Sequence, residues 1–595
     1  MSLNKEQEEK FKKLGISCYL ELSLILPTSY EDYKIDTVLK EHTNQVIDAT
    51  VESVYRAPNS IQITFYAHNF GHNIQGILFR PKPYMMHQFN VGERDYFYGM
   101  SECKMGKCSM TMPKKITKIG QITPKYKSNL RSDVMQRFIQ KNLSLEVLEE
   151  EGLKQEIASE LLSLHFPLNL PVKELPVSIL EALKYTELFL YMKQLSAKRR
   201  YFNALSSNPH NCDQWKKGLP FELTKEQNQA IEDIRIDLLN KKAAKRMVVG
   251  DVGSGKTMVI LAAAYMNQEN VSILMSPTTI LANQLYKEAQ KFLPNLKIAL
   301  VSNKTKKLDL SQYNFIIGTH ALLYRDLPVS SLVMVDEQHR FGTQQRNMLE
   351  KLVSSTAEKP HYLQFSATPI PRTQAMIETA HIDVSLITST PFKKNITSKV
   401  IQKKDFKDLL LHIESEIAKN NQVLIVYPLV EQSDILEYQS IEEARSYWEN
   451  KFEGVYITHG KDKEKEQVLV DFAKNGKILI ATTVVEVGIS LEKLSTVVIV
   501  GAERLGLSTL HQLRGRVSRT GLQGYCYLYT NTNNSQRLEE FCHTKSGFDI
   551  ANMDLKYRKS GDLLKGVNQS GTQFKWIDLV EDEKIVSEVK KDLVI

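Results

Sequence analysis

The spacing of apolar residues divides the chain into segments of different type. From about Leu219 to residue 530, short apolar runs alternate with segments whose apolar residues repeat with helical spacing. Strands that are apolar along their whole length, each followed by a helix, are typical of parallel sheets covered on both faces. The runs form two successive series that meet near residues 388–400. The pattern therefore predicts two tandem α/β domains.

The N-terminal part has a different pattern. Between Val46 and Ile119, short runs alternate apolar with polar residues, and Asn, Gly and Pro separate them. About five short strands in this segment predict a small barrel of the OB-fold type, with a small β-sandwich as the alternative. Helical spacing precedes this segment and returns after it, between residues 125 and 215.

The predicted fold class is multi-domain α/β with an added β-barrel, and no internal repeat interrupts it. The expected parts are a helical lead (1–45), a barrel (46–120), a helical connector (121–215), a first α/β domain (216–392), a second α/β domain (393–535) and a polar C-terminal region (536–595).

Composition narrows the class of protein. With 42% hydrophobic and 25% charged residues among 595, the chain is long enough for several folded cores. It has no apolar run of 18 residues and begins with charged residues, so we expect neither a transmembrane helix nor a signal peptide. Its six cysteines form no CxxC pair, so we expect reduced thiols and a cytoplasmic location.

The net charge of +8 permits a polyanionic partner without requiring one. Only 20 of the 77 basic residues are arginine. Because the arginine fork binds phosphate in a bidentate manner and lysine does not, we expect the arginines to mark special sites.

Residues 250–257 read GDVGSGKT, which fits the G-x4-G-K-[ST] phosphate-binding loop. A predicted strand precedes this P-loop and a predicted helix follows it, as such a loop requires. Lys256 would contact the β and γ phosphates of ATP, and Thr257 would bind Mg²⁺. The predicted nucleotide-binding residues are Gly250, Asp251, Val252, Gly253, Ser254, Gly255, Lys256 and Thr257.

An acidic pair completes this predicted site. The apolar run SLVMV ends in Asp336 and Glu337, about 80 residues after the P-loop. Asp336 would hold Mg²⁺, and Glu337 would position and deprotonate the attacking water. A solvated turn is the alternative, but the shared α/β series favours the catalytic interpretation.

Four arginines fall within 16 residues of the second α/β domain: Arg504, Arg514, Arg516 and Arg519. Arg516 and Arg519 are three residues apart, so on one helical turn they would share a face. We predict that both reach the γ-phosphate across the cleft between the two α/β domains. A basic nucleic-acid patch on a solvated helix is the alternative.

The order of these motifs resembles that of superfamily 2 helicases. The stretches GDVGSGKT, DEQHRFG, SATPIPRT, ATTVVEVGIS and ERLGLSTLHQLRGRVSR, with the tail DLKYRKSGDLLKGVNQSG, are similar to those of the RecG family, ATP-dependent DNA helicases that remodel branched DNA. The N-terminal LGISCYLELSLILPTSYEDY is similar as well, so the resemblance covers nearly the whole chain. It implies RecA-like domains in tandem, an OB-fold wedge domain, and ATP with Mg²⁺ as cofactors.

The resemblance also implies roles for single residues. Phe221 would stack on the adenine, and Gln227 would hydrogen-bond it. Contacts to the DNA backbone would come from residues at strand ends and in the tail: Thr278, Gln284, Thr319, His320, Thr482, Thr483 and Arg558. Coupling of nucleotide state to DNA would involve Ser366, Thr368, Arg504 and Gln569. In the barrel, Phe79 and Tyr84 would stack on bases, with core packing as the alternative.

The chain departs from the family pattern at two positions. Lys559 follows Arg558 where the family usually has Gly, and Ser518 stands where it often has Gly. Since a lysine resists the positive φ that Gly allows, we expect a different loop geometry in the tail.

The leading hypothesis is an ATP-driven translocase on double-stranded DNA that regresses stalled forks and unwinds Holliday-type junctions. A transcription-repair coupling factor shares the motor and tail motifs, but it carries further domains for which this length leaves no room. A non-catalytic fork-binding scaffold is the alternative from another class. We expect a monomer at the bacterial nucleoid with no membrane partner, and a single-strand DNA-binding protein as a second candidate partner.

Overall fold

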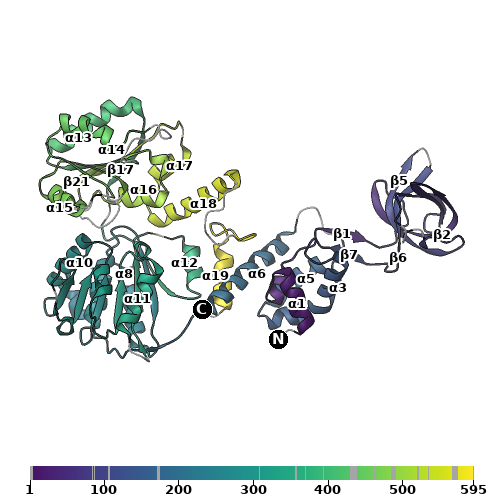
Figure 1. Cartoon of the computed structure of the whole chain (residues 1–595), viewed down its shortest axis with the longest axis horizontal. Helices are drawn as coiled ribbons and strands as arrows, with labels where there is room; N and C mark the ends of the chain where they lie inside the picture. Colours follow the sequence, from purple (N-terminus) through teal and green to yellow (C-terminus); the bar gives the residue numbers. More distant parts are fainter. Residues whose placement is uncertain are drawn as a thin grey trace. The chain divides into compact units, whose positions relative to one another are not determined.

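A computed structural model gives the fold of the chain (Figure 1). The chain forms two units, one of Met1–Tyr191 with Gln573–Asp578 and the other of Met192–Thr572 with Leu579–Ile595. The residues described are 4–82, 85, 87–104, 107–170, 175–306, 308–354, 358–368, 370–392, 394–428, 438–460, 462, 464–483, 491–518, 521–533, 535–565 and 574–593.

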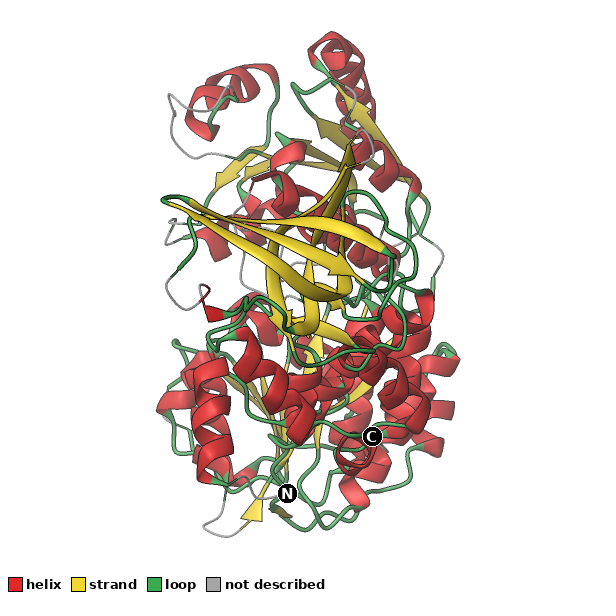
Figure 2. Cartoon of the chain, turned by 90° about the vertical axis from the view of Figure 1, so that its right-hand side faces the viewer, coloured by secondary structure: helices red, strands yellow, loops and turns green. Residues whose placement is uncertain are grey.

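The first unit contains the predicted barrel, whose strands are yellow in Figure 2. Alternate residues of one strand, Ile61, Ile63 and Phe65, are buried in its core, as the alternating pattern predicts. The barrel is closed, which confirms the OB-like fold and excludes the sandwich. Its strands follow the order β2-β3-β4-β6-β5, with bounds β2 (Thr43–Ala57), β3 (Ser60–Ala67), β4 (His72–Phe79), β5 (Arg94–Lys104) and β6 (Lys107–Ile116).

Cys103 and Cys108 stand opposite each other on β5 and β6 and form a disulfide. The expectation that all cysteines are reduced is therefore wrong for this pair. A cross-strand position brings two cysteines together whatever their spacing along the chain, so a search for CxxC misses them. The free thiols in the described residues are Cys18, Cys212, Cys526 and Cys542.

Along the sequence of the first unit, helices precede and follow the barrel strands. They are α1 (Lys5–Leu14), α2 (Tyr19–Ser23), α3 (Ser132–Asn142), α4 (Leu145–Glu150), α5 (Gln155–His165) and α6 (Val177–Ser196), the last of which continues into the second unit. The predicted helical lead also contains a strand, because β1 (Ser29–Asp32) pairs antiparallel with β7 (Ile122–Lys125). Tyr30 fixes this strand by donating a hydrogen bond from its hydroxyl to the Leu164 carbonyl at 2.9 Å.

The first α/β domain has a seven-stranded parallel sheet in the order β11-β12-β10-β13-β15-β9-β16. One apolar core packs α8, α9 and α10 on one face, and a second core packs α11 on the other. The strands are β9 (Lys245–Gly250), β10 (Ser272–Met275), β11 (Ile298–Val301), β12 (Phe315–Gly318), β13 (Leu332–Val335), β15 (His361–Ser366) and β16 (Asp383–Ile387). The helices are α7 (Asp213–Lys217), α8 (Lys225–Leu239), α9 (Lys256–Met266), α10 (Thr279–Phe292), α11 (Thr343–Val353) and α12 (Arg372–Glu378), and β8 (Asn203–Ala204) pairs with β14 (Glu358–Lys359).

The second α/β domain has a six-stranded parallel sheet in the order β17-β22-β21-β18-β20-β19. Its strands are β17 (Ile396–Ile401), β18 (Gln422–Val426), β19 (Val455–Thr458), β20 (Ile478–Ala481), β21 (Leu494–Val500) and β22 (Gly524–Tyr529). Its helices are α13 (Phe406–Ala418), α14 (Ile441–Lys451), α15 (Lys465–Asn475) and α16 (Leu507–Arg514). The two parallel sheets confirm the predicted fold class. The pattern misses β16 and β17, which are edge strands that flank the predicted domain boundary.

The C-terminal region, expected to be polar, contains three helices within its described residues. It forms α17 (Gln536–His543), α18 (Gly547–Lys565) and α19 (Glu583–Asp592). Helix α18 packs on α16, and Asp554 of α18 accepts a hydrogen bond from the Leu507 amide at 3.2 Å. Among the described helices, none has the length and apolar character needed to cross a bilayer.

Candidate active site

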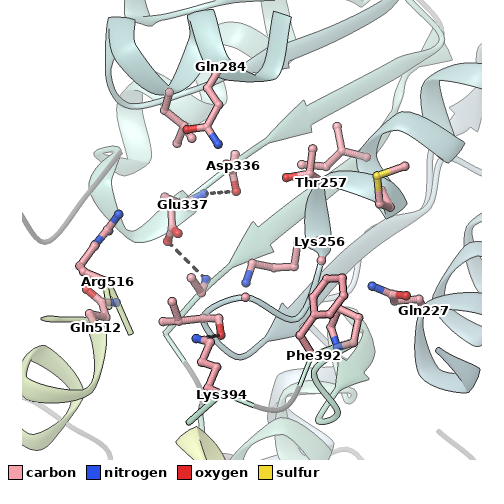
Figure 3. Close-up of a pocket in the computed structure, with 18 of the residues that line it drawn as sticks. Gln227, Lys256, Thr257, Gln284, Asp336, Glu337, Phe392, Lys394, Gln512 and Arg516 are labelled. Carbon is pink, nitrogen blue, oxygen red and sulfur yellow. Dashed lines mark hydrogen bonds between the residues drawn. The ribbon is translucent and has the colours of Figure 1, made fainter. Parts of the chain in front are cut away.

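A cavity of about 380 Å³ lies between the P-loop side of the first α/β domain and α16 of the second. Figure 3 shows Gln512 and Arg516 entering it from the second domain, opposite Lys256 and Thr257. Of the residues predicted for the ATP site, Phe221, Gln227, Val252, Gly253, Gly255, Lys256, Thr257, Asp336, Glu337 and Arg516 line this cavity. The chain therefore brings the predicted phosphate loop, acidic pair and arginine to one place.

The P-loop connects β9 to α9 through two glycines in the left-handed region. Gly253 has φ 78° and Gly255 has φ 76°, where a side chain would strain the backbone. A Cβ on Gly255 would also lie 2.2 Å from Nε2 of Gln227. Lys256 donates from Nζ to the carbonyl oxygens of Gly250 at 2.8 Å and Asp251 at 3.0 Å. Its ammonium group is thus held inside the loop that would surround the phosphates.

The residues predicted to contact the adenine lie beside this loop. Gln227 is buried, accepts from the Thr224 amide at 2.8 Å and donates to the Ser254 carbonyl at 2.8 Å. Its amide therefore holds the P-loop to the start of α8. Phe221 is 37% exposed at the cavity, so its ring is available for stacking.

The acidic pair follows β13, as predicted. Asp336 is buried, and burial together with the charge of Glu337 raises its pKa to about 7 although Lys256 opposes the shift. Glu337 has φ 50°, an unusual backbone conformation for a residue with a side chain. Such conformations concentrate at functional sites, where the surrounding structure maintains them.

The residues around Asp336 suit Mg²⁺. The charge of Lys256 does not offset the burial of the Asp336 carboxylate, and a divalent cation would supply further positive charge there. The described residues contain no cluster of three or more His, Cys, Asp or Glu that could hold a metal. Mg²⁺ in nucleotide sites is held by one or two protein side chains together with phosphates and water, so Asp336 and Thr257 fit this role.

A chain of hydrogen bonds connects Glu337 with the second α/β domain. Glu337 accepts from the Ala367 amide at 3.3 Å, directly after β15. The neighbouring Thr368 hydroxyl accepts from Nε2 of Gln512 at 2.8 Å. The predicted coupling residue Ser366 is buried and hydrogen-bonds the Thr368 amide at 3.2 Å. The motif SAT thus joins the acidic pair to α16.

The clustered arginines do not all face the cavity. Helix α16 ends at Arg514 with Gly515 as its cap, so Arg516 lies beyond the helix and the expected shared helical face is wrong. Arg514 is buried, donates to the Phe541 carbonyl at 3.0 Å and lies 4.2 Å from the centre of the Phe541 ring. Its role is in packing, whereas Arg516 lines the cavity. Arg519 is outside the described residues.

The carboxylate of Asp251 in the P-loop does not line the cavity. It accepts from His511 of α16 at 2.5 Å and from the Gly547 amide of α18 at 2.8 Å. Burial alone would raise its pKa, but His511 and the amides of Gly547 and Val252 lower it to about 2. The Asp251 carboxylate therefore connects the P-loop to the second α/β domain, and the predicted role of Asp251 in nucleotide binding stays a prediction.

Sequence reasoning missed several residues of the cavity. Phe392, 69% exposed, and Lys394, which donates to the Val252 carbonyl at 2.7 Å, come from the segment between the two sheets. Both line the cavity, as do Gln512 and Ser518. Gln512 lies in the stretch ERLGLSTLHQLRGRVSR, so the resemblance to helicases could have identified it. Phe392 and Lys394 gave no signal, because their segment looks like a domain boundary.

The residues predicted to contact DNA, and two of those predicted for coupling (Arg504 and Gln569), do not form one group in the described structure. Gln284 lines the ATP cavity instead of an outer surface. Thr278 and Thr319 accept hydrogen bonds from the amides of Leu281 and Ala321, while His320 and Arg504 are exposed. Thr482 and Thr483 follow β20 and are half-buried. Phe79 ends β4 and is 56% exposed. Tyr84, Gln569 and the side chain of Arg558 are outside the described residues, so all these roles stay predictions.

Comparison with known proteins identifies the class of this motor. A DEAD/DEAH box helicase domain matches residues 224–377, and a helicase conserved C-terminal domain matches residues 402–521. The two parallel sheets and their shared cavity are thus those of a two-domain, ATP-hydrolysing helicase.

The similar proteins then define the family. The ATP-dependent DNA helicase RecG of Helicobacter pylori is 43% identical over 609 residues, which cover 99% of this chain and 98% of the relative. That of Streptococcus pneumoniae is 32% identical, covering 98% and 93%. A solved structure of RecG bound to a three-way DNA junction matches with a TM-score of 0.55 and 26% identity, over 98% of this chain and 84% of that one. The chain belongs to the RecG family of ATP-dependent DNA helicases.

Proposed function

We propose that this helicase binds branched DNA and uses ATP to regress stalled forks and migrate Holliday-type junctions during repair and recombination. The observation that carries the proposal is the single cavity in which the P-loop, the acidic pair and Arg516 meet, within a chain similar to RecG over nearly all its length. The RecG structure with a three-way junction supports branched DNA as the substrate.

In this mechanism, Lys256 binds the β and γ phosphates and Glu337 positions the attacking water and accepts its proton. Mg²⁺, held by Asp336 and Thr257, supplies positive charge to the phosphates when bound. Arg516, and Arg519 as predicted, stabilise the charge on the transferring phosphoryl group from the second α/β domain. Phe221 stacks on the base.

Coupling to DNA uses the contacts between the two α/β domains. The bonds from Glu337 to Ala367 and from Thr368 to Gln512 give a route from the hydrolytic site to α16. Helix α18 packs on α16 and contains Arg558, the predicted DNA contact of the tail, while the predicted coupling residue Gln569 is outside the described residues. A change at the phosphates would thereby move the tail, which translocates the duplex.

The barrel acts as the wedge that separates the arms of the fork, with exposed Phe79 stacking on a base. The protein works as a monomer at the nucleoid, and a single-strand DNA-binding protein is a further partner.

Hydrolysis of ATP measured with forked DNA, linear duplex and no DNA tests the motor. We expect the fork to stimulate hydrolysis most, and Lys256→Ala to lower it at least about 100-fold, since groups that stabilise the transferring phosphate have effects of this size. Lys241→Ala, which removes an exposed lysine of the same domain, is the control. Equal rates with and without DNA would reject the proposal and favour the fork-binding scaffold.

Unwinding of a labelled fork tests the wedge separately. Phe79→Ala should slow unwinding while leaving ATP hydrolysis nearly unchanged. Tyr55→Ala removes another exposed aromatic ring from the same barrel, 67% exposed, and should have no effect. Unwinding by Phe79→Ala at the normal rate would reject the role of Phe79.

A further inference from the structure

Two adjoining cavities lie beside β9 and β15 of the first parallel sheet, apart from the ATP cavity. The two cavities, of about 390 Å³ each, share the residues Lys245, Asn347, Glu350, Tyr362 and His381, and we call them together the rear groove. Lys245 begins β9 and Tyr362 is the second residue of β15. The groove therefore starts at the amino ends of β9 and β15, about 16 Å along β9 from the P-loop, which follows the carboxyl end of that strand.

Positive charge predominates in the rear groove. Its cationic lining residues are Lys198, Arg199, Arg200, Lys245, Arg346, Lys351 and Lys359, against the acidic Glu350 and Glu378. Arg199 pairs with Asp383 at 2.7 Å and Lys359 with Glu350 at 2.8 Å. Lys198, Arg200 and Lys351 have no ion pair with any described residue. The groove thus retains positive charge that can bind an anion.

Two buried polar atoms in the wall of the groove have no hydrogen-bond partner among the described residues. They are Oη of Tyr362, a residue only 4% exposed, and Nδ1 of His381. Because buried polar groups in native proteins almost always have a partner, such atoms indicate a ligand or water. The Tyr362 hydroxyl can donate to an anionic oxygen. Nε2 of His381 lies 3.3 Å from Glu378, and both residues line the groove.

The electrostatic environment of His381 reports on the same charges. Burial lowers the pKa of His381, Glu378 opposes this, and Lys245, Arg199 and Lys198 lower it further. The cations of the groove therefore act on one partly buried ring from several segments of the chain. An anion bound between them would weaken this effect.

Aromatic rings stand at the rim of the groove. Tyr201 is 60% exposed and Phe202 is 39% exposed, and both line the cavity with the cations. Arg199 lies 5.5 Å from the centre of the Tyr201 ring, and Lys359 lies 3.8 Å from that of Phe202. Sites for single-stranded nucleic acid combine two features: cations that contact the phosphate backbone, and aromatic rings on which bases stack.

We propose that the rear groove binds a segment of single-stranded DNA, with phosphates on Lys198, Arg200 and Lys245 and a base against Tyr201. The hydroxyl of Tyr362 donates to one phosphate. A free nucleotide offers the same chemistry, but two adjoining cavities with an exposed aromatic rim fit a run of several nucleotides better. This site goes beyond the proposed function, because it adds a DNA contact outside the ATP cavity and outside the barrel.

The groove also reaches the hydrolytic motif. Gln338, the residue after Glu337, lines the second cavity and lies with its Nε2 atom 3.1 Å from Sδ of Met247. Arg346 donates to the Gln338 carbonyl at 3.3 Å. A strand bound in the rear groove would thus contact the segment that carries Glu337, the predicted catalytic base.

Salt-dependent binding of a labelled 20-nucleotide oligothymidine to the full-length protein, without ATP, tests the proposal. Each phosphate contact with a single strand contributes about 0.7 to the slope of log affinity against log salt, so we expect the triple variant Lys198→Ala, Arg200→Ala, Lys245→Ala to lose about 2 units of slope. The triple variant Lys403→Ala, Lys404→Ala, Lys407→Ala removes the same charge from exposed lysines of the second α/β domain and should keep the slope. Both variants should retain basal ATP hydrolysis, which shows that they are folded.

A photoreactive benzoylphenylalanine at position 201 locates the strand directly. We expect it to cross-link to oligothymidine, whereas the same group at exposed Tyr447 should not. An unchanged slope in the groove variant or absence of the cross-link at 201 would overturn the proposal. Protection of that cross-link by free thymidine monophosphate as effectively as by the oligonucleotide would overturn it as well, and would assign the groove to a nucleotide. Because no ATP is present, failure here is distinct from failure of the motor.

Discussion

Nε2 of His511 lies 2.5 Å from Oδ1 of Asp251, so a histidine of the second α/β domain contacts the P-loop of the first. Nη2 of Arg514 lies 3.1 Å from Nδ1 of His511. Because a guanidinium group only donates hydrogen bonds, Nδ1 accepts with its lone pair, and the ring proton is on Nε2. The imidazole is therefore neutral, in agreement with the pKa that burial lowers despite Asp251. Because Asp251 also binds the Gly547 amide, one carboxylate joins the P-loop, α16 and α18.

This contact predicts a loss of activity in His511→Ala. The substitution leaves a buried carboxylate short of one hydrogen bond, which costs about 1–3 kcal/mol in the state where the two domains are in contact. We expect kcat for fork-stimulated ATP hydrolysis to fall about tenfold, the equivalent of 1.4 kcal/mol. His511→Gln retains an N–H donor and should recover part of the rate. The contact has no role in catalysis if alanine gives the normal rate, or if glutamine is as harmful as alanine.

The backbone conformation at Ser518 shows why the family often has Gly at this position. It has φ 62°, is 5% exposed, and its hydroxyl has no hydrogen-bond partner among the described residues. Glycine adopts this conformation without the cost of about 1–2 kcal/mol that a side chain incurs. We expect Ser518→Gly to stabilise the protein by about 1 kcal/mol, after the greater entropy loss of glycine on folding is included.

Thermal unfolding followed by calorimetry measures this gain. Ser518→Ala is the matched control, because it removes the hydroxyl but keeps the Cβ atom and its strain. Its melting temperature should lie below that of Ser518→Gly. If the two variants melt together, the positive φ contributes nothing to the stability of this segment.

The sequence predicted those parts of the site that depend on local spacing. The P-loop and the pair Asp336 and Glu337 follow apolar strands, and their positions could be read from a few adjacent residues. The function of Asp251 could not, because its partner His511 is 260 residues away in the chain. The clustering of arginines in the sequence indicated Arg516 as a phosphate contact, but it indicated Arg514 equally, and Arg514 packs on Phe541. Only the fold separates a buried arginine from one that faces a cavity.

Edges and boundaries were hard to predict for a related reason. Strands β16 and β17 border the segment between the two sheets and are less uniformly buried than the central strands. Their apolar signal is therefore weak. The same segment supplies Phe392 and Lys394, which become part of the ATP cavity only when the two domains meet.

Phe392 should contribute to nucleotide binding. It lines the cavity with Phe221 and is 69% exposed, so it can stack on a base without rearrangement of the core. Stacking of a base on an aromatic ring contributes about 1–3 kcal/mol. We expect Phe392→Ala to raise the KM for ATP about tenfold with little change in kcat, and Phe392→Tyr to behave normally. Binding of a fluorescent ADP analogue provides an independent measure, and normal affinity in Phe392→Ala would contradict the prediction.

His165 should make the stability of the first unit depend on pH. It is buried, its Nε2 atom lies 2.9 Å from the Ser23 carbonyl, and its Nδ1 atom lies 2.9 Å from the Tyr126 hydroxyl. Donation to Ser23 and acceptance from Tyr126 require a neutral ring, and burial lowers its pKa to about 4 although the bond to Ser23 opposes this. Between pH 6.5 and 4 the unfolded state therefore binds more protons than the folded state, so stability falls as the pH falls.

The expected loss is about 3 kcal/mol over this range, from 1.36 kcal/mol for each pKa unit, with no further loss below pH 4. His165→Gln keeps a donor for Ser23 and an acceptor for Tyr126 but does not titrate. Urea unfolding of both proteins at pH 7.5, 6 and 5 isolates the effect, because all other titrating groups are common to them. His361 in the second unit also has its pKa lowered to about 4 by burial, and it contributes equally to both. The variant should thus lose less stability than the natural protein on acidification, and parallel losses would show that His165 is already neutral in the unfolded chain or charged in the folded one.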